Sequence, residues 1–179
     1  MQPSAVPDPT LELAIRGDQG ARSRIVDRHG PRVYALCRRL AADPEDCYQE
    51  IWEKVLKALE RFDPGGTASL GGWISVIARR HLTDRHRRLK VRGEVVPLTG
   101  LPAVDQGIDE RIAARQRRER LEAALQRLPY AQRQVVVLHH IHGLSLEAIA
   151  ADEGVAIGTL KSRLHRGRAR LSTLLGARR

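Results

Sequence analysis

Residues 144–171 read LSLEAIAADEGVAIGTLKSRLHRGRARL, and this stretch decides the fold of the C-terminal part of the chain. Leu146, Ile149 and Ala150 follow the i, i+3, i+4 spacing that places apolar side chains on one face of a helix. Gly154 stands where a tight turn between two helices favours a residue that tolerates positive φ. The stretch therefore predicts two helices joined by a short turn.

The second of these helices combines an apolar stripe with a strongly basic remainder. Its apolar positions are Ile157, Leu160, Leu164 and Leu171, and its solvent-facing positions are Lys161, Ser162, Arg163, His165, Arg166, Arg168 and Arg170. No acidic residue follows Glu153. Lysine and arginine neutralise phosphates and release counterions, and one or two of them can read guanine edges in the major groove. The pattern predicts a DNA-binding helix-turn-helix.

The composition of the whole chain favours a polyanionic partner. Its 179 residues carry a formal net charge of +10, and aromatic residues make up only 3%, so any core is aliphatic. Residues 79–92 hold seven lysines or arginines against the single acid Asp84, and residues 160–170 hold five with no acid. Two separate basic tracts predict two separate contacts with nucleic acid.

The apolar pattern is helical throughout, and we predict an all-α chain of two small helical domains joined by a flexible linker, with the helix-turn-helix in the second. The predicted parts are a disordered N-terminus at residues 1–9, a first domain at 10–92, a linker at 93–110 and a second domain at 111–179. Helical segments are expected at residues 11–17, 21–27, 32–40, 43–62, 70–88, 108–127 and 130–141. The last of these offers Val135, Leu138 and Ile141 to a small core.

Several residue types that carry chemistry in other proteins form no site in this pattern. Cys37 and Cys47 have no metal-ligand spacing and form no redox pair, which favours buried free thiols in a reducing cytosol. His139, His140 and His142 cluster, but no further ligand is near, so no metal is expected. No catalytic set or cofactor motif stands out, which favours a protein that is not an enzyme. Without a leader or a run of membrane-spanning length, we expect a cytoplasmic protein.

Two sets of motifs stand out from the rest of the chain. In the first domain they are PEDCYQE at residues 44–50, RFDP at 61–64 and WISVIARR at 73–80, followed by Asp84, Arg87 and Arg88. In the second they are LP at 128–129, GLS at 143–145, EAIA at 147–150 and GTLKSR at 158–163. With these motifs, spread over about residues 11–175, the chain resembles a bacterial RNA polymerase sigma factor of the extracytoplasmic-function group, which has only the second and fourth conserved regions. The resemblance implies a factor that binds core polymerase, recognises a two-part promoter and helps to melt it.

The resemblance implies that a helix beginning at Asp46 binds core RNA polymerase. Family members dock this helix on the clamp helices of the β′ subunit, and their fourth region on the β flap. Asp46, Gln49, Glu50 and Glu53 share one edge of the helix at i, i+3, i+4, i+7. Such a polar and acidic stripe suits basic residues on a partner helix, whereas without the resemblance a solvated face would be the simpler interpretation.

The resemblance also implies that the first domain holds the −10 element, with the helix at residues 70–88 against the exposed nontemplate strand. Its arginines would bind phosphates, and the glycine-rich turn at residues 63–69 would accept a flipped-out base close to the backbone. Trp73 fits the core better than a stacking platform, and Arg80 stands where the family usually has asparagine. The implied residues are Asp63, Gly65, Gly66, Ser69, Trp73, Arg79, Arg80, Asp84, Arg85, Arg87 and Arg88.

In the second domain the resemblance implies that the basic helix recognises the −35 element. Base or near-base contacts would come from Lys161, Ser162, His165 and Arg166, and phosphate contacts from Thr159, Arg163 and Arg168. Ala156 offers this helix no side-chain cap, and Thr159 would serve locally. Because the group is commonly held inactive by an anti-sigma factor, in some cases at the membrane, the resemblance implies such a partner as well.

Two other functions stay open from the residues alone. A stand-alone helix-turn-helix regulator with a dimerising or ligand-sensing first domain would bind palindromic DNA by itself, although a sensor domain has little use for the basic tract at residues 79–92. A recombinase or nuclease would need a nucleophile or a carboxylate metal site on a mixed α/β domain, and the helical first half argues against it.

Overall fold

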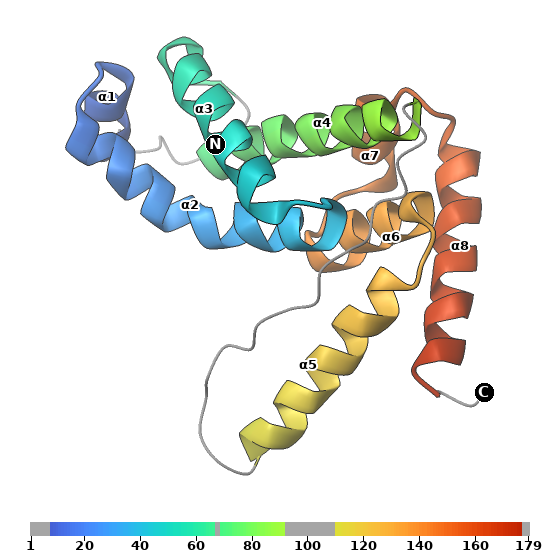
Figure 1. Cartoon of the computed structure of the whole chain (residues 1–179). Coiled ribbons are helices and arrows are strands. Elements are labelled where there is room, and N and C mark those ends of the chain that lie inside the picture. The colour runs from blue at the N-terminus through green and yellow to red at the C-terminus, as the bar shows by residue number, and fades with distance from the viewer. Residues whose placement is uncertain (1–7, 67–68, 92–109, 177–179) are drawn as a thin grey trace, which may run out of the picture. The chain divides into compact units, whose positions relative to one another are not determined.

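The computed structural model describes residues 8–66, 69–91 and 110–176, and all the regular structure in these ranges is helical (Figure 1). The chain divides into two compact units, Met1–Cys37 with Pro44–Arg88, and Arg38–Asp43 with Leu89–Arg179. The all-α prediction is therefore confirmed for the described residues. Most of the predicted linker and of the predicted N-terminal segment lies outside those residues, but Pro9, predicted to be disordered, and Glu110, predicted to end the linker, each begin a helix. Among the described helices, none is long and apolar enough to cross a membrane.

The first unit opens with two helices whose ends follow local sequence rules. The Asp8 carboxylate accepts a hydrogen bond from the Thr10 backbone N–H at 3.0 Å and caps α1 (Pro9–Ile15), and Gly17 closes this helix with a φ of +97°. Helix α2 (Gln19–Leu40) then runs unbroken through Pro31, where the sequence predicts two shorter segments.

The continuity of α2 through Pro31 has a tertiary cause. Proline removes one backbone hydrogen bond from a helix and normally ends or kinks it. Directly before it, Gly30 is buried, and a Cβ at that position would lie only 2.6 Å from the Tyr48 hydroxyl. Close packing against Tyr48 therefore holds the helix together at a point where its own sequence favours a break.

The core of the first unit lies among three helices and is mostly aliphatic, but the prediction of a purely aliphatic core is wrong, because Trp52 and Phe62 are buried in it. Helix α3 (Pro44–Ala58) ends in a 3-10 turn, η1 (Leu59–Arg61), and is followed by α4 (Leu70–Val91). The buried side chains of these elements include Ile51, Val55, Leu59, Ile74, Ala78 and Leu82. They share the core with Val33 and Leu36 of α2. Both cysteines are also fully buried, Cys37 on α2 and Cys47 on α3. They are free, as predicted, and their thiols hydrogen-bond to each other, which the sequence did not show.

The second unit contains α5 (Glu110–Gln126), α6 (Tyr130–Val136), a π-helical turn η2 (Val137–Ile141), α7 (Leu146–Glu153) and α8 (Ile157–Leu174). Val135 and Leu138 are buried as predicted, but Ile141 is 40% exposed, so its assignment to the core is wrong. A π turn has more residues per turn than an α-helix, which rotates Ile141 away from the face that Val135 and Leu138 share. The Leu144 backbone N–H donates to the Leu138 carbonyl at 3.1 Å and closes the turn.

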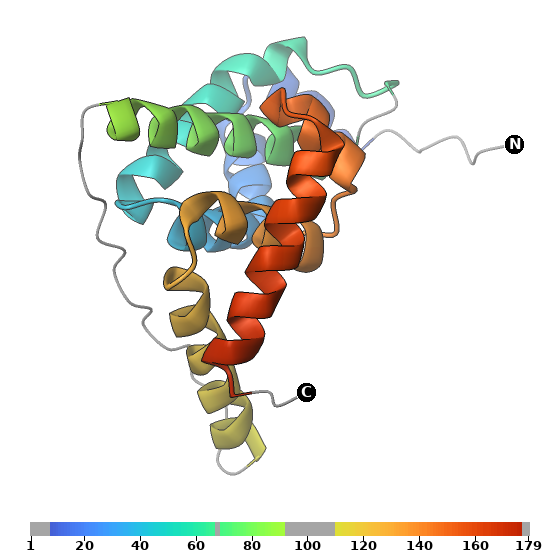
Figure 2. The ribbon, with the colours of Figure 1, turned by 90° about the vertical axis from the view of Figure 1, so that its right-hand side faces the viewer.

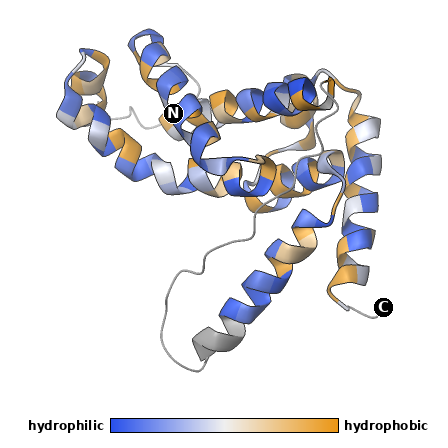
Figure 3. Ribbon diagram, in the orientation of Figure 1, coloured by the Kyte–Doolittle hydropathy of each residue, from blue (hydrophilic) through white to orange (hydrophobic). Residues whose placement is uncertain are grey.

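Helix α8 packs closely against α6 at a glycine (Figure 1 and Figure 2). A Cβ at the buried Gly167 would meet Val136 Cγ2 at 2.9 Å and the Gln132 carbonyl oxygen at 3.3 Å, so this contact requires a residue without a side chain. The buried Leu160 and Leu164 lie on the same helix, and polar and apolar residues alternate along it in Figure 3. The α8 stripe predicted from the sequence is thus confirmed at Leu160 and Leu164, while Gly167 adds a contact that the apolar pattern could not show.

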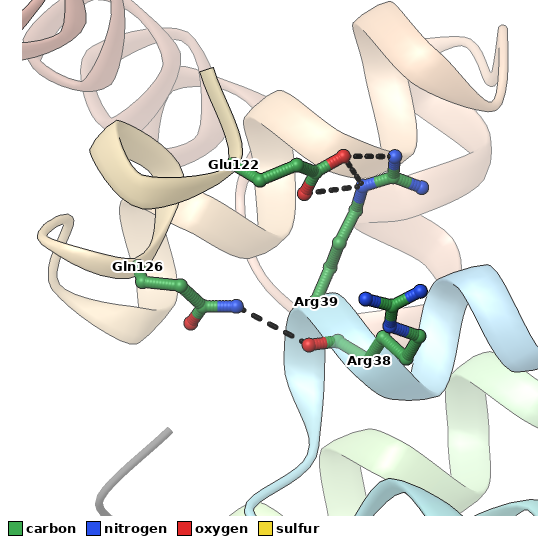
Figure 4. Close-up of polar contacts among 4 residues, drawn as sticks. All are labelled: Arg38, Arg39, Glu122 and Gln126. Carbon is green, nitrogen blue, oxygen red and sulfur yellow. Dashed lines mark hydrogen bonds and ion pairs between the residues drawn. The ribbon is translucent and has the colours of Figure 1, made fainter. Parts of the chain in front are cut away.

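Polar contacts join residues 38–43 to α5 within the second unit (Figure 4). The Glu122 carboxylate is buried, and Nε of Arg39 donates to both of its oxygens at 3.1 Å, with a further contact from Nη2. The Gln126 side-chain amide donates to the Arg38 carbonyl at 3.2 Å. Gln126 also accepts from the buried Arg133 at 2.9 Å, and burial lowers the pKa of Arg133 to about 10, so the guanidinium stays charged at neutral pH. These charges are therefore buried with partners, as buried charges must be.

Candidate nucleic-acid and polymerase interface

The helix-turn-helix is built as its sequence predicts. Ser145 caps α7 by accepting a hydrogen bond from the Ala148 N–H at 3.1 Å. Gly154 has a φ of +65°, in the left-handed region, and its N–H donates to the Ala150 carbonyl at 2.9 Å. The turn glycine is thereby confirmed. Helix α8 begins after Ala156, which makes no side-chain cap hydrogen bond, as its sequence predicts.

Most of the predicted −35 residues are exposed along α8. They are Thr159, Lys161, Ser162, His165, Arg166 and Arg168. Arg163 differs, because its guanidinium donates to the Glu153 carboxylate at 3.1 Å and Glu153 is only 8% exposed. This pair lies at the junction of α7 and α8, so the Arg163 charge is neutralised inside the motif. The remaining face is cationic and free of carboxylates, which suits the phosphates of a major groove.

The basic tract on α4 is arranged differently. Arg79 is only 5% exposed, so its side chain is directed into the protein and does not present a charge at the surface. Arg85 donates to Glu50 of α3 at 2.9 Å, and Arg87 lies 4.0 Å from Asp84 one helical turn before it. Arg80 and Arg88 are exposed. The sequence assigns all these arginines the same role, but in the structure they divide into internal and surface groups.

A polar network joins α3 to α4 behind the predicted polymerase face. Glu50 lies 2.9 Å from both Arg85 and the Nε2 atom of the buried His81, although the His81 N–H direction does not make a hydrogen bond. On its other side, His81 Nδ1 is 2.7 Å from Lys54 Nζ. Because an ammonium group can only donate, His81 Nδ1 is the acceptor in this contact. Glu50 is thus a structural partner of α4 as well as a surface residue.

The four predicted polymerase-binding residues share the exposed side of α3. Asp46, Gln49, Glu50 and Glu53 are all exposed, whereas Cys47, Ile51 and Val55 on the same helix are buried. The spacing predicted this division, because i, i+3, i+4 and i+7 lie on one helical face. The observed division of α3 into an exposed polar side and a buried apolar side therefore agrees with the sequence prediction.

The glycine-rich turn before α4 is held by Asp63 and Ser69. The Asp63 carboxylate accepts from the Gly65 N–H at 2.9 Å, and its carbonyl accepts from the Gly66 N–H at 3.2 Å. Ser69 Oγ accepts from the Gly72 N–H at 3.2 Å at the start of α4. Asp63 and Ser69 thereby hold the backbone, while residues 67–68 lie outside the described part of the chain.

Trp73 stands on the first turn of α4 and is half-buried. Its ring centroid lies 5.1 Å from that of the buried Phe62, with the planes inclined by 55°. One side of the indole therefore packs on the core and the other part meets solvent. The packing is consistent with the core role expected from the sequence, and Phe62 directly precedes the turn at residues 63–66.

Comparison with known proteins identifies the family. Sigma-70 region 2 matches residues 25–92, and Sigma-70 region 4 matches residues 118–171. The chain is 35% identical over 184 residues to "ECF RNA polymerase sigma factor SigE" of Mycolicibacterium smegmatis, covering 98% of this chain and 70% of that protein. The chain belongs to the ECF RNA polymerase sigma factors. It is thus a factor for promoter-specific initiation of transcription.

Two solved sigma factors resemble this one over most of their length. Sigma factor RpoE from Bartonella quintana, solved in complex with the anti-sigma factor NepR, has 26% identity and a TM-score of 0.67, with 88% of this chain and 98% of that chain covered. CnrH, solved with the cytosolic domain of CnrY, has 26% identity and a TM-score of 0.59, with 95% and 97% covered. The family resemblance seen in the sequence is confirmed.

Three features of the interface were missed at the sequence level. Arg79 is buried, Glu50 joins His81 and Arg85, and Gly167 sets the distance between α6 and α8. Of these features, only Gly167 could have been noticed in the sequence. A glycine inside a helix is unfavourable for helix formation, so its presence indicates a close packing contact. Among the described residues, no group of three histidines, cysteines or carboxylates is placed to hold a metal ion.

Proposed function

We propose that this sigma factor holds the −35 element of its promoters with α8, while α4 and the turn before it hold the −10 element. The observation that carries this proposal is the exposed cationic face of α8 in a complete helix-turn-helix within the region 4 match. A helix of this charge and position suits the major groove of duplex DNA.

On α8 we divide the residues by what their surroundings leave available. Lys161, Ser162, His165 and Arg166 project from adjacent turns and serve as base or near-base contacts. Thr159 and Arg168 flank them as phosphate contacts. Arg163 binds Glu153 and positions the turn, so its contribution to DNA binding is indirect.

In the first unit, we place the −10 contact at the turn and the exposed side of α4. Arg80, Arg87 and Arg88 supply cations for the nontemplate strand, and the partly exposed Trp73 packs on Phe62, the residue before Asp63. Gly65, Gly66 and Ser69 form that backbone, and Asp84 tempers the charge of Arg87. Arg79 and Arg85 act inside the protein, where burial and Glu50 hold them.

We assign polymerase binding to the exposed edge of α3. Asp46, Gln49, Glu50 and Glu53 form a polar and acidic stripe that suits a partner helix with basic residues, as on the β′ clamp, while the second unit meets the β flap. The network behind Glu50 fixes the carboxylate between His81 and Arg85, so the face is rigid before it binds. Preorganisation of this kind lowers the entropic cost of association.

We also propose that an anti-sigma factor controls this chain. RpoE and CnrH, the two structural relatives, were each solved with a partner of this kind or its cytosolic domain. A protein that covers the α3 edge or the α8 face would block polymerase or DNA, since both faces are exposed in the free chain.

A transcription experiment on a randomised promoter library tests the function. Core RNA polymerase is supplied with the library, with and without this chain, and the transcribed molecules are sequenced. We expect transcripts only with the chain, and two enriched blocks at fixed spacing. Enrichment of a single palindrome that the chain binds without polymerase would instead support a stand-alone regulator and overturn the proposal.

A further inference from the structure

The two cysteines of the chain come together across the hairpin of α2 and α3. Cys37 lies three residues before the end of α2 at Leu40, and Cys47 lies three residues after the start of α3 at Pro44. The short connection between the helices therefore brings two positions ten residues apart to one level of the hairpin. Both side chains are completely buried, both thiols are free, and they share a hydrogen bond.

The surroundings make the two sulfurs unequal. The hydrogen bond with Cys47 and burial raise the pKa of Cys37, so this thiol keeps its proton and donates it. The same hydrogen bond, helped by His81 and Arg85 of α4, lowers the pKa of Cys47 against the opposing effect of burial. A thiolate next to a protonated thiol is the arrangement from which a disulfide forms, because one sulfur attacks the oxidant and the other resolves the product.

We propose that Cys37 and Cys47 are a peroxide-sensitive dithiol that closes to a disulfide across the α2–α3 hairpin. The oxidant is a hydroperoxide, of which hydrogen peroxide is the smallest and so the best able to reach a buried sulfur. This is a modification site within the polymerase-binding unit, and it does not depend on the assignment of DNA contacts.

The reaction balances in two steps. The Cys47 thiolate attacks one peroxide oxygen, the O–O bond breaks, and hydroxide leaves, which gives a sulfenic acid on Cys47. The Cys37 sulfur then attacks the Cys47 sulfur, the S–O bond breaks, and the Cys37 proton leaves with the hydroxyl group as water. The first hydroxide takes up the proton that Cys47 had released. In total, two thiols are oxidised to one disulfide and one peroxide is reduced to two waters.

The position of the pair gives the disulfide a consequence for α3. Cys47 directly follows Asp46 and is close to Gln49 and Glu50, which form the proposed polymerase face. Its thiolate also faces His81 and Arg85, the two partners of Glu50. Oxidation removes that negative charge and locks the start of α3 to the end of α2, so the reduced and oxidised forms differ at the polymerase face.

Intact-mass spectrometry of the full chain tests this site directly. The reduced, folded protein is treated with stepwise amounts of hydrogen peroxide, and free thiols are then counted in denaturant. We expect a mass loss of about 2 Da with both thiols lost together, as disulfide formation requires, and recovery with dithiothreitol. Folded protein that keeps both thiols, or that gains oxygen without losing 2 Da, would overturn the proposal.

Two serine variants assign the roles of the sulfurs. Cys37→Ser leaves Cys47 without a resolving partner, so peroxide should give a sulfenic acid that dimedone traps. Cys47→Ser should react at least about tenfold more slowly, because burial still disfavours the Cys37 thiolate after the hydrogen bond to Cys47 is lost. Both variants are first checked for native helix content by circular dichroism. Equal rates and equal dimedone labelling in the two variants would contradict the assignment. The wild-type mass result does not depend on how the variants fold.

Discussion

The basic tracts on α4 and α8 look alike in the sequence but differ in the folded chain. On α4, Arg79 is buried and Arg85 is bound to Glu50, so part of the charge serves the protein itself. On α8, Arg163 pairs with Glu153, while Lys161, Arg166, Arg168 and Arg170 are exposed on a helix that carries no acid. Packing therefore sets the charge that is available to a ligand, and a count of arginines overstates that charge for α4.

This difference suits two different kinds of DNA. A duplex presents two regular rows of phosphates, and a helix with a continuous cationic face binds it in a strongly salt-dependent way. A single strand is held more by shape, stacking and backbone contacts, which the turn at residues 63–66 and the half-buried Trp73 offer. We therefore expect α8 to dominate the salt dependence of promoter binding.

The largest effect should come from removing exposed charge on α8. The double variant Lys161→Ala, Arg166→Ala should lower the affinity of the holoenzyme for its promoter about 30-fold or more, since two base contacts of about 1–3 kcal/mol each are lost. Fluorescence anisotropy at several salt concentrations measures this, and the log–log salt slope should decrease.

Arg163→Ala is the matched control for that variant, because it removes the same charge from the same helix at a position already paired with Glu153. It should lower the thermal midpoint of unfolding, while the log–log salt slope of promoter binding should change little. If it reduced the salt slope as strongly as the double variant, the distinction between paired and exposed arginines would be lost.

The next effect concerns the contact that positions α8. Gly167→Ala places a Cβ 2.9 Å from Val136 Cγ2 and 3.3 Å from a backbone oxygen, and overpacking of this kind costs about 1–3 kcal/mol. Denaturant unfolding of the second unit should show the loss. Gly158→Ala on the same helix meets nothing within 4 Å and should be neutral or stabilising. An equal loss in both variants would refute the proposed role of Gly167.

A smaller effect is expected from disrupting the network in which Glu50 of α3 pairs with Arg85 and His81 of α4. Glu50→Gln removes the carboxylate that Arg85 and His81 share, and because Glu50 is about half exposed, the stability loss should stay within about 1 kcal/mol. Affinity for core polymerase, measured by competition, should also fall. Glu53→Gln, on the same exposed edge, should lower polymerase affinity without changing the melting temperature.

The smallest effect is a pH dependence that each unit carries through one histidine. Burial chiefly lowers the pKa of His140, with His139 and Arg168 adding to the shift, and burial with Arg28 and Arg32 lowers that of His29. The unfolded histidines bind protons more readily than the folded ones, so stability should be full above about pH 6.5 and decrease as the pH falls below it.

Melting curves from pH 8 to pH 5.5 check this sign for the wild type, and His29→Gln and His140→Gln show the share of each histidine. Each substitution should make the acid decline shallower. A wild-type melting temperature that rises between pH 7 and pH 6 would contradict the lowered pKa values.

Much of the fold follows from local rules that a sequence displays. The start of α3 at Pro44 with acidic residues in its first turn, the glycine turn at Gly154 and the stripe of Leu160 and Leu164 all obey short-range rules, so they could be predicted. The unbroken α2 through Pro31 and the exposed Ile141 could not, because packing against Tyr48 and a π turn override the local pattern.

The candidate site divides in the same way. Exposure of Asp46 and Glu53 follows from helical periodicity, whereas the burial of Arg79 and the pairing of Arg85 with Glu50 depend on how α3 and α4 pack. The meeting of Cys37 and Cys47 likewise depends on the geometry of the hairpin. Side chains that act across two elements are therefore the part that single-sequence reasoning misses.

The most direct measurement of the division of labour between α8 and α4 uses two probes and two variants in the holoenzyme. One probe is a duplex with the upstream block from the promoter library, and the other is a single strand with the downstream block. We expect Lys161→Ala, Arg166→Ala to weaken binding of the duplex alone, and Arg80→Ala, Arg88→Ala to weaken binding of the single strand alone. If both double variants weakened both probes equally, the two tracts would be interchangeable and the division between α8 and α4 would be contradicted.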